Sequence, residues 1–325
     1  MVLPGPFAKP FIFSAALLLS GWIARRAEKA SSLVELLFGT QLIQMLQSLF
    51  SPQFDQVFAA ITLLGDGSVL VALSAAIYWC FDKSRGRLVT YVVLFGAYLN
   101  FFLKIIIPWP RPPIDLRLAE KGETSYGFPS GHAQDSTTFW TWITLDFRKR
   151  ILALLGTTIV VAVGISRIYL GLHYPAQVIG GWIVGLAVAC FGMLVLRCLP
   201  RRSEQMRAIP QVLFAFSTLV PMAIALAFGL VGEAYPGQIG GYLFGFSLGA
   251  LVEERYVHFT NEVSVAQRIL RLAIGGMLTV FLVLVLGMIV PETYLIPSFV
   301  NYVIRGLFVA VIVPSIFTRI EHHQT

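Results

Sequence analysis

The sequence predicts an all-α, polytopic membrane protein, and three observations lead to that class. Of its 325 residues, 57% are apolar and only 13% are charged. The apolar residues gather in runs long enough to cross a bilayer as helices. The basic residues stand in short clusters between these runs, which is typical of membrane topology and argues against nucleic-acid binding despite the net charge of +7. The cysteines, Cys80, Cys190 and Cys198, lie in or beside apolar segments and indicate no disulfide framework.

Residues 1–53 are expected to form N-terminal membrane or interfacial helices. The apolar run 11–24 precedes two arginines and lacks the charge order of a signal peptide, so we interpret it as a retained helix or a membrane-dipping segment. Residues 31–50 are amphipathic, with glutamines placed between leucines. That pattern is compatible with an interfacial helix or with a span packed against protein.

Residues 54–200 are predicted to form a core of six helices. A full-length span over 88–107 ends at a proline cluster, because proline cannot continue the helical hydrogen bonds. The helix expected over 132–147 is unusually rich in Gln, Asp, Ser and Thr, so it should face protein or a cavity rather than lipid. Apolar helices are expected on either side, over 54–67, 68–81, 151–165 and 175–196.

Residues 201–325 are predicted to form an additional bundle of about four transmembrane helices, near 208–232, 238–255, 267–290 and 297–318. Arg305 lies inside the last of these. A charged side chain in that position needs a partner, and we expect a structural ion pair with Glu253 or Glu254.

Three short polar blocks interrupt the apolar core. They are Lys104-Ile-Ile-Ile-Pro-Trp-Pro-Arg111-Pro112, Phe128-Pro129-Ser130-Gly131-His132, and Ser166-Arg167 followed by His173 and Gln177. Cations at a membrane edge are costly and indicate function. Three of them, with backbone N–H groups at helix starts, make a pocket for a doubly charged oxyanion. Two histidines beside it supply a nucleophile and a proton donor.

This pattern resembles the type-2 phosphatidic acid phosphatase family, the membrane relatives of vanadium haloperoxidases. The family has Lys, six residues and Arg-Pro; then Pro-Ser-Gly-His; then Ser-Arg, five residues, His, three residues and Asp. The first two blocks match fully, and the third matches at Ser166, Arg167 and His173. The resemblance covers roughly residues 55–197. It implies a lipid phosphate phosphatase that needs no metal or other cofactor.

The resemblance also implies roles for individual residues. His173 is the expected nucleophile and forms a phosphohistidine, while His132 is the expected general acid. The cations Lys104, Arg111 and Arg167 are expected to clamp the phosphate oxygens, with donors added by Ser130 and Gly131. Ser166 is expected to cap its helix or to brace Arg167.

Gln177 departs from the family pattern, which has Asp at that position. A glutamine can accept the hydrogen bond that orients His173 but brings no charge, so orientation can survive while electrostatic activation weakens. Asp135, one turn after His132, is a possible carboxylate partner for that histidine. The commoner role for a carboxylate in a first helical turn is to favour the helix dipole.

Charge predicts which side the site faces. The three blocks fall at one membrane face, and ten basic residues between 83 and 207 fall in loops at the other, which marks that other face as cytoplasmic. We therefore expect a site facing the periplasm, the outside or an organelle lumen, and a cytoplasmic C-terminus. Expected substrates are lipid phosphate monoesters or polyprenyl pyrophosphate held at the bilayer edge. A lipid transporter or scramblase, or a catalytically impaired lipid-phosphate-binding protein, stays open as an alternative.

Overall fold

The computed structural model describes residues 32–120, 123–198, 216, 219–229 and 233–322. Within these ranges every regular element is a helix and there is no strand, as predicted for an all-α membrane protein. The apolar run 11–24 and most of the helix expected over 208–232 lie outside the described residues.

Two bent helix pairs precede the long helices. A helix over Ser32–Phe38 meets α2 (Gln41–Phe50) at 64°, and α3 (Asp55–Leu63) meets α4 (Gly67–Cys80) at 47°. The amphipathic stretch packs against protein through one face, because Ile43 is fully buried and Gln47 Nε2 donates to the carbonyls of Leu116 and Tyr169. The stretch 31–50 is therefore bent and packed against protein, and an interfacial position for it stays a prediction.

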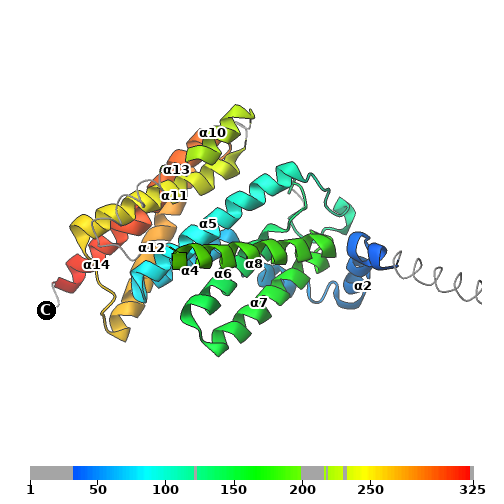
Figure 1. Ribbon diagram of the computed structural model, residues 1–325, viewed down its shortest axis with the longest axis horizontal. Helices are drawn as coiled ribbons and strands as arrows, with labels where there is room; N and C mark the ends of the chain where they lie inside the picture. Colours follow the sequence, from blue (N-terminus) through cyan, green and yellow to red (C-terminus); the bar gives the residue numbers. More distant parts are fainter. Residues whose placement is uncertain (1–31, 121–122, 199–215, 217–218, 230–232, 323–325) are drawn as a thin grey trace, which may run out of the picture.

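The core continues with α5 (Lys83–Ile106), α6 (Gly131–Phe147), α7 (Arg150–Tyr169) and α8 (Pro175–Cys198). Figure 1 shows α6, α7 and α8 as neighbouring helices in green, and α6 contacts α5, α7 and α8. Its polar side chains are buried, which confirms that this helix faces protein; they are Gln134, Asp135, Ser136, Thr137 and Thr138. Burial of Gln134, Ser136, Thr137 and Thr138 is tolerable because each side chain donates to a backbone carbonyl, as when Thr138 Oγ1 donates to the Gln134 carbonyl at 2.9 Å.

The C-terminal part is a second group of helices packed beside the core (Figure 1). Its elements are α10 (Leu219–Ala227), α11 (Ala234–Val252), the π-helical turn η3 (Glu253–Val257), α12 (Val265–Ile289), α13 (Leu295–Leu307), the π-helical turn η4 (Phe308–Ile312) and α14 (Val313–His322). Among these, α11 and α13 make the most extensive helix–helix contact.

Aromatic side chains and ion pairs join this group to the core. Tyr78 Oη and Trp79 Nε1 donate to the carbonyls of Ala310 and Val309, at 3.0 and 2.9 Å. At the same end of the molecule, Lys83 pairs with Glu253 at 3.2 Å and Arg87 pairs with Glu254 at 3.1 Å. Glu253 is fully buried, so Lys83 supplies the charge that its carboxylate needs, whereas Glu254 keeps part of its hydration.

The partner predicted for Arg305 was wrong. Arg305 pairs with Glu292, from the connection between α12 and α13, and Asn301 Nδ2 and Tyr302 Oη also donate to that carboxylate. The reason is topological. Glu253 and Glu254 begin η3, directly after α11 and beside the start of α5, so they pair with Lys83 and Arg87 instead.

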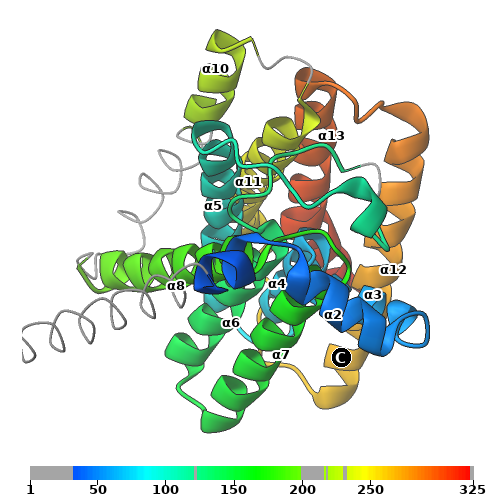
Figure 2. The same ribbon diagram turned by 90° about the vertical axis from the view of Figure 1, so that its right-hand side faces the viewer.

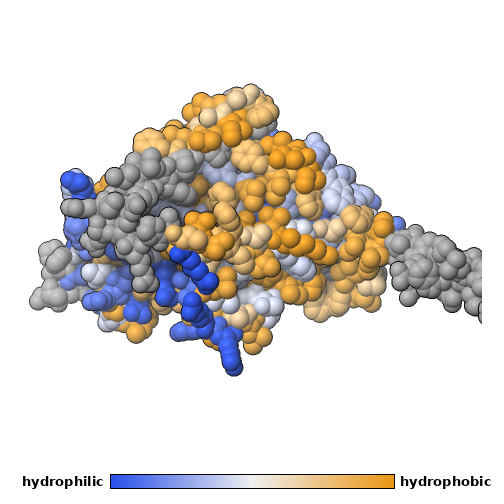
Figure 3. All heavy atoms as spheres, in the orientation of Figure 1, coloured by the Kyte–Doolittle hydropathy of each residue, from blue (hydrophilic) through white to orange (hydrophobic). Residues whose placement is uncertain are grey.

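In the part of the chain that the structure describes, five helices are long and apolar enough to cross a membrane, and the number rises to seven if each bent pair counts as one span. The five are Lys83–Ile106, Arg150–Tyr169, Pro175–Cys198, Val265–Ile289 and Leu295–Glu321. Figure 3 shows the corresponding surface, hydrophobic over the middle of this face, with strongly hydrophilic atoms gathered at its lower left. The protein is therefore a polytopic helical membrane protein.

Candidate active site

The three polar blocks meet at the end of the molecule that carries α2. Figure 2 looks onto this end, where the connection between α5 and α6 crosses the helix ends. Arg111 Nη1 lies 2.9 Å from His173 Nε2. Lys104 Nζ and Arg111 Nη2 both donate to Ser125 Oγ, at 2.9 and 3.0 Å. The expected convergence of residues from distant parts of the chain is therefore present.

His173 sits in the short turn between α7 and α8, and Gln177 fixes its ring. Gln177 Nε2 donates to the Pro110 carbonyl at 2.8 Å, and its Oε1 accepts from the Tyr174 N–H at 3.2 Å. These two backbone partners decide which end of the carboxamide faces the ring, because a carbonyl can only accept and an N–H can only donate. The oxygen lies 3.1 Å from His173 Nδ1, so Nδ1 carries the proton. Nε2 keeps its lone pair and faces Arg111.

The same surroundings keep the imidazole neutral. His173 is 1% exposed. Burial lowers the pKa of His173 well below its ordinary value, and the positive charges of Arg111, Arg167 and Lys104 lower it further, while the Gln177 hydrogen bond opposes them. A neutral imidazole that keeps its Nε2 lone pair is the form that can act as a nucleophile, and the incoming phosphorus must replace the Arg111 hydrogen bond to it.

Arg167, in the last turn of α7, is held on two sides. Its two terminal nitrogens donate to the two Glu120 oxygens at 2.7 and 2.9 Å, and Nη1 also donates to Thr62 Oγ1 at 3.0 Å. The backbone links it to the nucleophile, since the Leu172 and His173 N–H groups both donate to the Arg167 carbonyl. Burial raises the pKa of Glu120, but the hydrogen bonds and charge of Arg167 outweigh it and leave the pKa below its usual value.

The Pro129-Ser130-Gly131-His132 segment begins α6 at Gly131, close to the predicted start. The Ser130 N–H donates to the Gln177 carbonyl at 3.0 Å, which ties this turn to the start of α8. Ser130 Oγ is fully buried and has no hydrogen-bond partner among the residues described. Such a group is rare in a folded protein and fits a donor held ready for a ligand oxygen. An added Cβ at Gly131 would meet only Asn100, at 3.5 Å, so packing does not demand glycine there.

A carboxylate does lie beside His132, but it belongs to Asp66 and not to Asp135. Asp66 Oδ2 lies 3.8 Å from His132 Nε2. The approach depends on Gly65, because a Cβ there would come within 2.9 Å of the His132 carbonyl oxygen. Asp135 is buried, and its Oδ1 has no hydrogen-bond partner in the described part of the chain. Burial and the positive charge of Arg167 lower the pKa of His132 to about 4, although the Glu120 and Asp66 carboxylates raise it.

Ser166 takes neither of its two expected roles. Its hydroxyl donates to the Val163 carbonyl at 2.7 Å, inside its own helix, and not to Arg167. The acceptors for Arg167 come from elsewhere, from Glu120 and Thr62.

Sequence reasoning missed five residues that contact the expected site residues: Thr62, Asp66, Glu120, Glu123 and Ser125. Asp66 stands in a Gly-Asp-Gly turn, which is a signal only for chain reversal. The other acidic residues stand in a polar loop between two motif blocks. Their position between those blocks was the one available hint.

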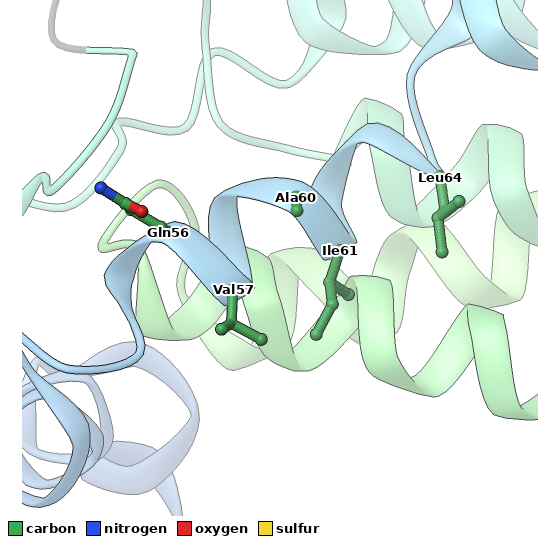
Figure 4. A pocket seen from close by; sticks show the side chains of 5 residues that line it. All are labelled: Gln56, Val57, Ala60, Ile61 and Leu64. Atoms are coloured by element: carbon green, nitrogen blue, oxygen red, sulfur yellow. The ribbon is translucent and has the colours of Figure 1, made fainter.

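A groove of about 470 Å³ lies on the outer side of α3 (Figure 4). It is lined by Gln56, Val57, Ala60, Ile61 and Leu64. None of these is a basic residue or a histidine, so the groove is distinct from the cluster around His173. Its largely apolar lining is what a helix presents toward lipid.

The helical membrane fold, the paired histidines and the surrounding cations define a membrane-embedded phosphatase. The chain belongs to the PAP2 superfamily. The family model described as "PAP2 superfamily" matches residues 85–204. A second one, "PAP2 superfamily phosphatase, transmembrane extension", matches residues 237–325.

Individual relatives agree. The chain is 31% identical to phosphatidylglycerophosphatase B of Bacillus subtilis over 42% of this chain and 71% of that protein. It is 31% identical to lipid A 4'-phosphatase of Bacteroides thetaiotaomicron over 45% of this chain and 71% of that protein. A crystal structure of a transmembrane PAP2-type phosphatidylglycerolphosphate phosphatase from Bacillus subtilis is 25% identical and covers 59% of this chain and 96% of that one, with a TM-score of 0.45.

Proposed function

We propose that this phosphatase hydrolyses phosphate monoesters or diphosphates of membrane lipids through a phosphohistidine on His173. The observation that carries the proposal is the orientation of the His173 ring. Gln177 holds Nδ1–H, so the Nε2 lone pair faces the cluster of Arg111, Lys104 and Arg167. A nucleophile fixed beside three oxyanion-binding cations is the arrangement that phosphoryl transfer requires.

In the first half-reaction, His173 Nε2 attacks phosphorus and the bond from phosphorus to the lipid oxygen breaks. Protonated His132 gives its proton to that leaving oxygen, so the lipid departs as an alcohol, or as a monophosphate when the substrate is a diphosphate. Arg111, Arg167 and the Ser130 hydroxyl donate to the non-bridging oxygens, whose charge spreads as the transition state becomes metaphosphate-like.

In the second half-reaction, water attacks the phosphohistidine. Neutral His132 accepts a proton from that water, the phosphorus–nitrogen bond breaks, and inorganic phosphate leaves. His173 regains its lone pair and His132 its proton, so the cycle closes. Asp66 attracts the protonated form of His132 that the first half-reaction needs, but burial and the Arg167 charge outweigh it. The negative charge of the bound phosphate must therefore help to protonate the ring.

A lipid substrate fits both the site's position and the relatives. The site lies where membrane-crossing helices end, so an acyl or prenyl chain can remain in the bilayer while the phosphate enters the cluster. Similar proteins carry names that specify lipid phosphates, among them sphingosine-1-phosphate phosphatase 2 of Mus musculus and undecaprenyl-diphosphatase of Sulfolobus acidocaldarius. Independence of metals and cofactors stays a prediction.

We also propose that the site faces away from the cytoplasm. Lys83, Arg85 and Arg87 begin α5, and Lys104 lies at the other end of the same helix, beside the site. Arg148, Lys149 and Arg150 likewise lie between α6 and α7, at the ends of these helices away from the site. Basic clusters in short loops favour the cytoplasmic face. In Figure 1, α14 lies at the end of the molecule opposite α2, which supports a cytoplasmic C-terminus.

The test is phosphate release by the purified full chain in detergent micelles, with a chelator present. The panel contains phosphatidate, phosphatidylglycerol phosphate, sphingosine 1-phosphate and undecaprenyl diphosphate. We expect release from at least one of them, and none in a His173→Ala variant. Movement of lipid headgroups across vesicles without phosphate release would instead favour the transporter alternative. Binding without release or movement would favour an impaired homologue.

A further inference from the structure

The cations of the site already have anionic and polar partners, and one loop supplies them. The Glu120 carboxylate accepts hydrogen bonds from both terminal nitrogens of Arg167. The carbonyl and hydroxyl oxygens of Ser125 accept hydrogen bonds from Arg111. The same hydroxyl also accepts one from Lys104. Glu123 Oε1 lies 3.7 Å from Arg111 Nη2. Residues of the 120–125 stretch thus occupy donors that a phosphate group would use.

The backbone before Glu120 is firmly anchored. The Leu118 N–H donates to the Leu170 carbonyl at 3.0 Å. Leu116 packs against Gly171, which has a φ of +68° and no room for a Cβ. Glu120 itself has a φ of +48°, a conformation uncommon for a residue with a side chain. Such outliers persist where surrounding contacts impose them and are concentrated at functional sites. The anchoring places the carboxylate in the fork of Arg167.

The geometry points to Glu120 as a specificity residue, which makes the site accept doubly charged phosphate groups and reject the singly charged phosphodiesters of the bulk membrane. This inference rests on the proposed function. A substrate phosphate must replace the Glu120 carboxylate on Arg167. That exchange requires the carboxylate side chain alone to turn away toward water, and Glu120 is about one-third exposed.

Charge decides the outcome of that exchange. A diester phosphate carries one negative charge, as Glu120 does, so replacing one by the other gains no attraction to Arg167. A monoester or diphosphate brings at least one more charge and a third non-bridging oxygen for Arg111 and Lys104. The carboxylate is available for this competition at neutral pH, because its pKa lies below the ordinary value for Glu. Selectivity of this kind matters most in a bilayer, where diesters surround the site at high concentration.

The test compares Glu120→Gln with the wild type. Gln keeps the shape of the side chain and removes its charge. Phosphatidate in neutral detergent micelles is the substrate, and phosphatidylglycerol, a diester, is the competitor, with the total surface concentration held constant. We expect the variant to lower the KM for phosphatidate about tenfold and to become about tenfold more sensitive to phosphatidylglycerol. The control is Asp115→Asn, which removes one charge from an exposed position of the same connection and should change neither value.

Glu120→Ala serves as a second variant and should shift both values in the same direction. A fall in kcat with unchanged KM and unchanged sensitivity to phosphatidylglycerol would overturn the inference, since Glu120 would then only orient Arg167. Loss of folded protein in both variants would overturn it too, because the ion pair would then serve stability. The proposed function is judged separately, by phosphate release from the wild type.

Discussion

Buried arginines at the site and at the seam between the core and the C-terminal helices are partnered differently. Along this seam, every side-chain nitrogen of Arg271 reaches a protein acceptor. Its Nε and Nη2 donate to the two Glu321 oxygens, and Nη1 donates to the carbonyls of Trp79 and Thr260. At the site, Arg111 meets a neutral imidazole, and Arg167 retains a buried Nε without a partner among the described residues.

The difference separates structural from chemical cations. A buried arginine whose donors all reach fixed acceptors holds helices together, and changing it is expected to affect stability. A buried arginine with an exchangeable carboxylate, near the unpartnered hydroxyl of Ser130 and two histidines, is suited to bind a ligand. Variants in the two regions should therefore separate catalysis from folding.

The largest expected effect comes from His173→Ala, which removes the nucleophile. Turnover should fall by about 10⁴-fold or more, since a residue that forms the covalent intermediate cannot be replaced by its neighbours. Phosphate release at saturating substrate measures it. His258→Ala, which changes a histidine on the seam side, should retain wild-type turnover. Substantial activity in His173→Ala would place the chemistry elsewhere.

Arg271→Leu should give the largest loss of stability with the least effect on chemistry. It leaves the half-buried Glu321 without its partner, and removing one member of a largely buried pair costs up to about 3 kcal/mol. Thermal unfolding in detergent measures the loss. Turnover per folded molecule should stay within about twofold. A selective loss of turnover with unchanged stability would remove the distinction between the two regions.

Gln177→Leu should lower kcat by about 100-fold, because the Nδ1–H would lose its acceptor and the wrong tautomer would compete. Gln177→Asp keeps an acceptor, adds a charge, and loses the donor to the Pro110 carbonyl. Its turnover should equal or exceed that of the wild type. Parallel losses in both variants would mean that the contact with Pro110, and not ring orientation, is the important one.

The pH profile tests the state of His173. Its folded-state pKa is depressed, so the ring stays neutral at and above its ordinary value near 6.5 and is protonated only at lower pH. The His173-dependent loss of kcat/KM should therefore occur below about pH 6.5 as pH falls. Gln177→Asp should shift this loss of kcat/KM to higher pH, because a carboxylate stabilises imidazolium. An acid limb above pH 7 in the wild type would contradict the neutral ring.

The smallest effect is expected from Thr62→Val. It removes one hydroxyl acceptor from Arg167 and leaves Glu120 in place. A single hydrogen bond of this kind contributes about 1 kcal/mol, so kcat/KM should fall about fivefold. Phosphatidate hydrolysis at low substrate measures it. A fall of a hundredfold would mean that Thr62 contacts substrate directly.

The all-α class, the buried polar helix and the meeting of the three blocks could be predicted, because hydropathy and motif spacing are properties of neighbouring residues. The partners of charged groups could not. Glu292, and not Glu253, reaches Arg305 because of how α12 and α13 are connected, which no local pattern encodes. Asp66 reaches His132 only because a glycine lets α4 approach α6. The division of the chain at residues 53 and 200 stays a prediction.

The proposed mechanism depends on transfer of the phosphoryl group to the imidazole of His173. The most direct measurement is rapid denaturing quench of the full chain with lipid substrate labelled at phosphorus, followed by peptide mapping under alkaline conditions. We expect one acid-labile, alkali-stable label on the peptide that contains His173, and none in His173→Ala. Label on another residue, or turnover of labelled substrate without any phosphoryl-enzyme in the quenched wild type or in slow variants such as His132→Ala, would contradict the account.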